Sequence, residues 1–212
     1  MLDALILAAA PLLATAFTLW GSPATWLEVI AFGLSLWMVA CNLRVNPLGW
    51  PLAMASSLLY ALLFAQSKLY GEALLQLFFV IVAAWGWQQW LRGTSKDGLR
   101  LTVHHLPSRQ RWQVAAATLA AWPVIGLLLR FGTDSDVPFL DALPTVGSVA
   151  GQLLLGRKLV ENWIVWLAVN VVSIGVFAYK ALWLTVLLYA IFAVLSWVGW
   201  RAWKLRLADE RS

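Results

Sequence analysis

Residues 162–179 read NWIVWLAVNVVSIGVFAY, a run without a single charged side chain. A helix needs about 20 apolar residues to cross the roughly 30 Å of hydrocarbon in a bilayer, and this run approaches that length. Similar blocks recur along the 212 residues, of which 62% are hydrophobic and 12% charged, whereas soluble domains have about 25% charged residues. The sequence therefore predicts an integral membrane protein built from helices, because helices satisfy their backbone hydrogen bonds in lipid.

Eight apolar segments are expected to span the membrane as helices. The first lacks the basic start and the small-residue cleavage site of a secretory signal peptide, so we expect it to be a retained helix. The segments are residues 2–20, 24–41, 48–65, 70–91, 112–131, 137–155, 162–179 and 180–203.

The basic residues divide unevenly between the two ends of these segments. Of the 15 lysines and arginines, Lys68, Arg130 and Lys180 fall on one face of the membrane, and all the others fall on the opposite face. Loops rich in Lys and Arg stay in the cytoplasm, so both termini and the 92–111 connection are predicted to be cytoplasmic. If the first segment does not span, only the N-terminus changes side. The net charge of +5 thus reflects membrane topology rather than nucleic-acid binding.

An internal repeat with an offset of 113 residues organises the chain. It predicts two three-helix units, separated by one helix that gives both units the same orientation in the membrane. Transporters built from repeats bind their substrates at the repeat interface. The matched residues are Trp50 with Trp163, Phe64 with Phe177, Phe79 with Phe192, and Gly86-Trp87-x-x-Trp90 with Gly199-Trp200-x-x-Trp203.

The predicted fold class is therefore an all-α integral membrane protein with two parallel three-helix bundles, a linker helix and an additional N-terminal helix. The expected parts are an N-terminal helix at 1–22, bundle A at 23–91, a cytoplasmic loop at 92–111, the linker helix at 112–133, bundle B at 134–204 and a cytoplasmic tail at 205–212.

Aromatic and polar side chains follow one face of the 162–179 segment. Trp163, Trp166, Asn170 and Ser173 recur there at helical spacing. An asparagine at that depth needs polar partners rather than lipid, so the face is expected to line a cavity. The alternative is that Asn170 makes an interhelical hydrogen bond used for packing alone.

Three other segments offer side chains to the same cavity. The repeat counterpart, at 48–65, carries Ser57, Tyr60 and Phe64 in a similar pattern, and Thr145 and Gln152 share a polar face with Asp141. Glu72 and Gln76 lie one helical turn apart in the 70–91 segment. We expect Ser57, Tyr60, Phe64, Gln76, Thr145 and Gln152 to join the cavity lining.

The carboxylates and the remaining reactive side chains favour structural roles. Glu28, Glu72 and Asp141 lie in the first turns of their helices, where the helix dipole favours negative charge. Cys41 is the one cysteine of the chain, and no Cys/His cluster has metal-ligand spacing, so neither a metal nor a cofactor is expected. Known catalytic motifs are also absent from the sequence, which predicts a protein that is not an enzyme.

Two runs of residues resemble the PnuC family over roughly residues 24–203. They combine spaced Trp, Asn, Gln and Gly-Trp elements in the same order as in that family. The first comprises Asn46-Pro-Leu-Gly-Trp50, Ser56-Ser57-Leu-Leu-Tyr60, Leu69-Tyr70-Gly71-Glu72 through Gln76, and Gly86-Trp87-x-x-Trp90; the second is Gln152-x-x-x-x-Arg157-Lys158-x-x-Glu161-Asn162-Trp163-x-x-Trp166-x-x-x-Asn170.

This resemblance implies a SWEET-like fold, a homotrimer in the bacterial cytoplasmic membrane, and facilitated diffusion of nicotinamide riboside. It also implies a functional link to a separate cytoplasmic kinase that traps the substrate by phosphorylation. Relatives that carry thiamine or riboflavin, or a sugar carrier of the same fold, remain alternatives, as does a membrane protein without transport activity. The residues agree with the first substrate: Trp166 can stack on a pyridinium cation, and the amides and hydroxyls can bind a carboxamide and a ribose.

Overall fold

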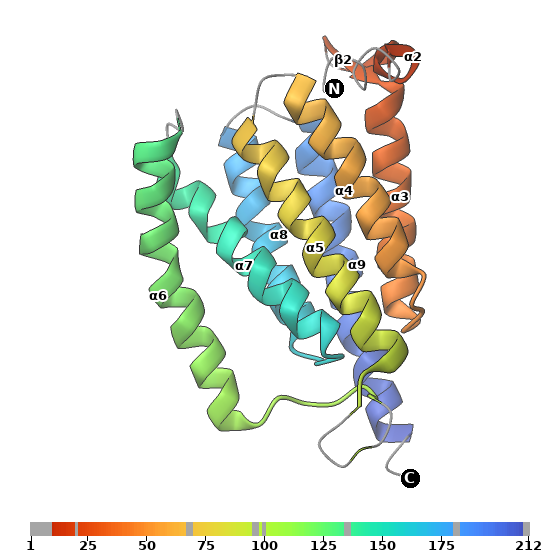
Figure 1. Ribbon diagram of the computed structural model, residues 1–212, viewed down its shortest axis with the longest axis vertical. Helices are drawn as coiled ribbons and strands as arrows, with labels where there is room; N and C mark the ends of the chain where they lie inside the picture. The colour runs from red at the N-terminus through yellow and green to blue at the C-terminus, as the bar shows by residue number, and fades with distance from the viewer. Residues whose placement is uncertain are drawn as a thin grey trace. The chain divides into compact units, whose positions relative to one another are not determined.

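The computed structural model describes residues 10–19, 21–66, 70–94, 98, 101–133, 137–179 and 183–209. The chain forms two compact units, Met1–Gln88 and Gln89–Ser212. Long helices make up most of the described residues (Figure 1). Six of these helices have the length and composition needed to cross a membrane, and the apolar stretch of a further helix, Gly49–Leu63, is shorter.

The helical architecture predicted from the sequence is confirmed from residue 26 onward, with ends that differ by up to several residues. The elements are α2 (Ala10–Leu13), β1 (Thr15–Leu19), β2 (Ser22–Thr25), α3 (Trp26–Leu43), α4 (Gly49–Gln66), α5 (Tyr70–Arg92), α6 (Ser108–Gly132), α7 (Pro138–Gly156), α8 (Asn162–Tyr179) and α9 (Trp183–Asp209).

The predicted N-terminal spanning helix is wrong for residues 14–19. After the four-residue helix α2, the chain forms an antiparallel hairpin in which Thr15 pairs with Thr25 and Phe17 with Ala24. β-branched and aromatic residues favour strands, and Gly21 has a φ of 83°, which glycine adopts readily in a turn. The apolar run was compatible with either structure, and residues 1–9 and 20 lie outside the described part of the chain.

A capping box joins the hairpin to α3 in the first unit. Thr25 N–H donates to Glu28 Oε2 at 2.7 Å, and Glu28 N–H donates to Thr25 Oγ1 at 3.2 Å. These bonds satisfy two backbone donors that the start of a helix leaves unpaired. The structural interpretation of Glu28 is therefore confirmed, and the hairpin lies at the end of α3 opposite Arg44.

The first unit packs α3 against α4 through a buried polar pair. Ser35 Oγ and Ser56 Oγ are 2.8 Å apart, and each hydroxyl lies within hydrogen-bond distance of the Ala31 carbonyl oxygen, at 2.8 and 3.3 Å. On α4, Trp50 is 1% exposed and its ring lies against Gly86 of α5. The absence of a side chain at Gly86 lets α5 approach the indole closely.

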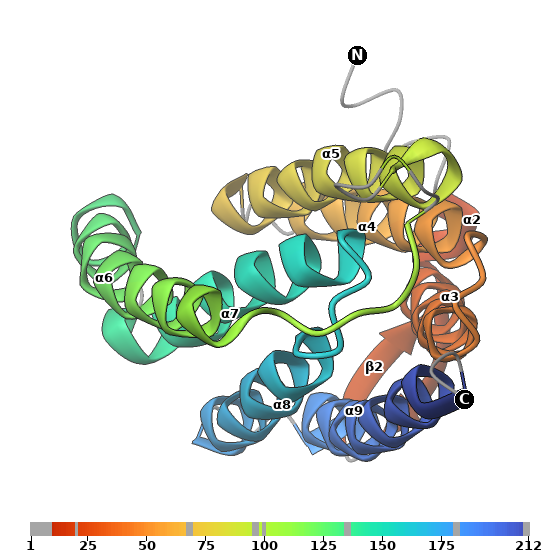
Figure 2. The ribbon, with the colours of Figure 1, turned by 90° about the horizontal axis from the view of Figure 1, so that it is seen from below.

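In the second unit, α6 packs on α7, α7 on α8, and α8 on α9, as Figure 2 shows from below. Trp163 of α8 lies against Gly199 of α9 and meets Trp203 edge to face, with ring centroids 5.6 Å apart. Trp203 is 0% exposed. This aromatic contact fixes the separation of α8 and α9.

Part of the 92–111 connection is docked on the turn between α7 and α8. His104 N–H donates to the Lys158 carbonyl, and Val160 N–H donates to the His104 carbonyl, both at 3.1 Å. Leu101, Val103 and Leu106 are buried. We call residues 101–107 the strap, because this non-helical segment bonds to the turn between α7 and α8.

The predicted repeat recurs in the detail of the backbone. Val45 and Lys158 stand 113 residues apart, and they have positive φ values of 55° and 54°. Four backbone hydrogen bonds around them also recur at this offset: Val45 to Asn42 and Lys158 to Leu155; Asn46 to Cys41 and Leu159 to Leu154; Gly49 to Asn46 and Asn162 to Leu159; Trp50 to Pro47 and Trp163 to Val160.

Candidate functional site

The predicted aromatic and polar face lies along α8. Asn170 and Ser173 are 3% and 2% exposed, and Trp166 is half-buried. Such low exposure of polar side chains in an apolar helix means that they face protein or an enclosed space rather than lipid.

Asn170 is held by a residue that the sequence did not single out. Its Nδ2 donates to Ser196 Oγ of α9 at 3.1 Å, and Ser196 Oγ donates to the Phe192 carbonyl of its own helix at 2.7 Å. Ser196 is also buried, at 3% exposure. A signal was nevertheless available, because Ser196 is a polar residue at the position where the first repeat has Ala83.

The ring of Trp166 lies against α7 at a glycine. A Cβ atom added at Gly151 would lie 3.0 Å from Trp166 Cε2 and 3.1 Å from its Nε1. About nine in ten Cβ contacts in proteins are longer than this, so Gly151 makes room for the indole. Trp166 thus rests on α7 while part of its surface stays accessible.

Trp163 and Thr145 are engaged in contacts within the second unit. Trp163 is 3% exposed in its packing against Gly199 and Trp203, and among the described residues its Nε1 has no hydrogen-bond partner. Thr145 Oγ1 donates to the Asp141 carbonyl of the same helix at 3.0 Å. These placements favour support roles for both residues.

The other predicted residues are distributed over both units. Gln152 is buried in the second unit, and Ser57, Tyr60 and Gln76 are half-buried in the first unit. The side chains of Phe64 and Glu72 lie outside the described residues. The structure therefore places Trp166, Asn170 and Ser173 on one helix, α8, and the predicted residues of the first unit belong to a separate part of the chain.

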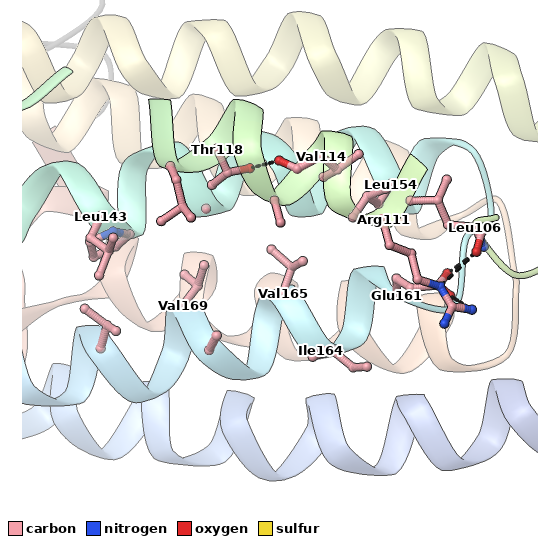
Figure 3. A pocket seen from close by; sticks show the side chains of 16 residues that line it. Leu106, Arg111, Val114, Thr118, Leu143, Leu154, Glu161, Ile164, Val165 and Val169 are labelled. Carbon is pink, nitrogen blue, oxygen red and sulfur yellow. Dashed lines mark hydrogen bonds and ion pairs between the residues drawn. The ribbon is translucent and has the colours of Figure 1, made fainter. Parts of the chain in front are cut away.

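A pocket of about 480 Å³ opens between α6, α7 and α8, and its lining includes none of the predicted site residues (Figure 3). Leu143, Val165 and Val169 are typical of its apolar lining. At one end, Glu161 accepts from Arg111 Nη2 at 2.9 Å. The pocket offers few partners to a ligand with several hydroxyl groups, so we do not assign it to such a ligand.

Glu161 makes an ion-pair and hydrogen-bond cluster that the sequence motif did not explain. Its carboxylate accepts from Leu106 N–H at 3.0 Å, and it lies 3.1 Å from His105 Nδ1. With Arg111, these contacts tie the strap to the start of α8. The described residues contain no group of three or more His, Cys, Asp or Glu side chains that could hold a metal ion.

Comparison with known proteins gives the same architecture. The nicotinamide riboside transporter PnuC of Escherichia coli (strain K12) is 29% identical over 177 residues, which cover 72% of this chain and 74% of that protein. The riboflavin/roseoflavin transporter RibM of Streptomyces davaonensis is 29% identical over 194 residues, covering 90% of each chain. A crystal structure of the vitamin B3 transporter PnuC aligns with a TM-score of 0.71 and 25% identity, over 88% of this chain and 83% of that one.

These similarities extend over most of the described helices and match an all-α, multi-pass membrane protein. The family described as Nicotinamide mononucleotide transporter matches residues 25–205. This chain therefore belongs to that family of membrane transporters, and it is not an enzyme.

Proposed function

We propose that this protein carries nicotinamide riboside across the bacterial cytoplasmic membrane by facilitated diffusion. The observation that carries the proposal is the pair formed by Trp166 and Asn170, one helical turn apart on α8, with the ring rested on Gly151 and the amide bonded to Ser196. The ligand is a pyridinium cation with a carboxamide and a ribose. An aromatic face attracts the cation, and an amide pairs with its polar groups.

Charge favours the riboside over the mononucleotide. The α8 helix has no charged residue, and α7 has Asp141 alone. A phosphate group brought to this face would be buried without the Arg or Lys that such groups require, at a large desolvation cost. We therefore expect the phosphorylated form to be rejected, so that phosphorylation by a separate cytoplasmic kinase retains the product inside.

Riboflavin is the second candidate substrate, because the similarity to RibM covers 90% of both chains. Riboflavin shares the hydroxylated chain of a riboside, but its ring system is neutral and larger. It would gain less from the cation-binding face of Trp166 than a pyridinium ion does. The two ligands can thus be separated by direct competition.

The oligomeric state and the orientation in the membrane are further parts of this proposal. The protein assembles with other copies as a homotrimer, as the sequence resemblance implies. The basic ends of the helices face the cytoplasm. Because a hairpin stands in place of a spanning helix, we expect the N-terminal part of the chain on the outer side: β1 and β2 lie at the opposite end of α3 from Arg44.

The test is calorimetric titration of the purified protein with nicotinamide riboside, riboflavin and thiamine. We expect the riboside to bind most tightly. Trp166→Leu should cost about 1–2 kcal/mol of binding free energy, and Asn170→Leu about 1–3 kcal/mol. Trp112→Leu is the matched control, because Trp112 is 78% exposed on α6.

Unchanged affinity in both site variants, while each remains correctly assembled, would refute the site. Tighter binding of riboflavin than of the riboside would instead favour the second candidate. Uptake into proteoliposomes with the same ligands distinguishes transport from binding alone.

A further inference from the structure

The hydrogen bonds of Ser196 determine which end of the Asn170 amide is available to a ligand. Ser196 Oγ has a single proton, and it lies 2.7 Å from the Phe192 carbonyl oxygen, which can only accept. The proton is therefore used there. Toward Asn170, 3.1 Å away, Ser196 Oγ can act only as an acceptor.

The partner atom on Asn170 must then be Nδ2, which donates. The Oδ1 atom is left on the other side of the amide, and among the described residues no protein group bonds to it. One of the two Nδ2 protons is used on Ser196, so an amide held in this way presents Oδ1, a hydrogen-bond acceptor, in a fixed direction. It selects a ligand group that carries an N–H or O–H proton.

The first repeat shows that the repeat fold does not need this pair. Its residues at the corresponding positions are Ser57 and Ala83, and Ala83 is buried at 1% exposure. An alanine is thus accommodated at this place in one repeat. The bond between Asn170 and Ser196 is a feature of the second repeat alone, on the helix that carries the candidate site.

We infer that Ser196 is a positioning residue that fixes the Asn170 amide with its carbonyl oxygen toward the substrate, and that this makes the site select a carboxamide over a carboxylate. The inference rests on the proposed function. A ligand carboxamide can donate its N–H to Asn170 Oδ1. A carboxylate at the same place would put two acceptors together without a proton between them, so the hydrogen bond to Oδ1 is lost.

The test compares nicotinamide riboside with nicotinic acid riboside, in which a carboxylate replaces the carboxamide. Calorimetric affinities are measured for the parent and for Ser196→Ala. Without the serine hydroxyl the amide can turn, so the loss of one oriented hydrogen bond should weaken nicotinamide riboside by about threefold to tenfold. The preference for the carboxamide over the carboxylate should fall by about tenfold, because an amide that can turn can present Nδ2 where Oδ1 stood.

Two further variants separate orientation from packing. Ser196→Thr keeps a hydroxyl oxygen and should restore the preference. Ser35→Ala removes a buried serine hydroxyl from the other unit, where it bonds to Ser56 and Ala31, and should leave the preference unchanged. A merely structural role for Ser196 would weaken both ligands equally.

The outcomes also separate this inference from the function on which it rests. If the parent binds neither riboside, the proposed function fails. If the parent binds nicotinamide riboside and Asn170→Leu weakens it, but Ser196→Ala leaves the ratio of the two affinities unchanged, the orientation inference alone is overturned.

Discussion

The two repeats have the same backbone turn and the same tryptophan-on-glycine contact, but their polar interiors differ. The first repeat pairs Ser35 with Ser56, whereas the second pairs Asn170 with Ser196. Two serine hydroxyls can hydrogen-bond to each other, and few donors or acceptors then remain unpaired. An amide has more donors and acceptors than one serine can engage, so the second repeat retains bonding capacity for a ligand.

This comparison assigns different roles to shared and unshared features. Shared features, such as the contacts of Trp50 with Gly86 and of Trp163 with Gly199, are expected to support folding in both units. Features found in one repeat alone are expected to support substrate binding or to hold other segments of the chain, such as the strap. Three sets of substitutions test this division.

The largest effect is expected from removing the shared tryptophans. Trp50→Ala and Trp163→Ala should each lower the free energy of unfolding by about 3–5 kcal/mol, because each opens a cavity against a glycine. Trp163→Ala should cost slightly more, since its edge-to-face contact with Trp203 is lost as well. Denaturant unfolding of the detergent-solubilised protein measures both, with the exposed Trp112→Ala as control. A large cost in one unit alone would contradict the equivalence of the repeats.

Adding a methyl group at the shared glycines should have the next largest effect. A Cβ at Gly86 would lie 2.6 Å from Trp50 Cζ2, and one at Gly199 would lie 2.6 Å from Trp163 Cε2. Alanine at either position should therefore destabilise the protein by about 1–3 kcal/mol through overpacking.

Two other glycines serve as the matched control, and alanine at these positions should not lower stability. Gly33 on α3 and Gly175 on α8 have no atom within 4 Å of an added Cβ, apart from their local helix backbone. Alanine there should leave stability unchanged or raise it by up to about 1 kcal/mol, because it favours the helix. Thermal melting of the four alanine variants compares them directly, and destabilisation at all four positions would argue against the indole contact as the cause.

The smallest effect is expected at a residue without an equivalent in the other repeat. Glu161 corresponds to Leu48 of the first repeat. Glu161→Leu should release the strap and lower the free energy of unfolding by about 1–2 kcal/mol, because the ion pair and the hydrogen bonds that are lost are partly exposed. Hydrogen exchange at the Leu106 amide should become faster, while exchange in α8 stays slow. Arg109→Gln removes an exposed neighbouring charge and serves as control. Unchanged exchange at Leu106 would show that Glu161 does not hold the strap.

Sequence periodicity predicted the long helices well because a membrane helix requires a continuous apolar run. The same property misled the interpretation of the N-terminal segment, since Thr15 to Leu19 is apolar enough for a helix but pairs as a strand. The strap was also missed. Leu101 and Val103 alternate with polar neighbours, but their burial depends on a turn more than fifty residues away, which no local pattern encodes.

The candidate site was predicted in part for a related reason. Trp166 and Asn170 follow from helical spacing within one segment. The residues that hold them, Gly151 and Ser196, lie on other helices: Gly151 has no side chain, and Ser196 differs from the first repeat only by a hydroxyl in place of Ala83. Supporting residues emerge when the helices are packed, whereas residues with distinctive chemistry can be recognised from the sequence alone.

The turn before α4 and α8 shows where the common origin of the two repeats is preserved. Val45 and Lys158 differ in shape, charge and polarity, yet both hold a left-handed backbone that costs such residues about 1–2 kcal/mol. Neither residue prefers this conformation, so the flanking helices impose it. A sequence alignment scores this pair as a mismatch, although the backbone φ angles of the two residues, 55° and 54°, differ by 1°. The ancestry of a duplicated membrane protein can thus be read in its torsion angles after its side chains have diverged.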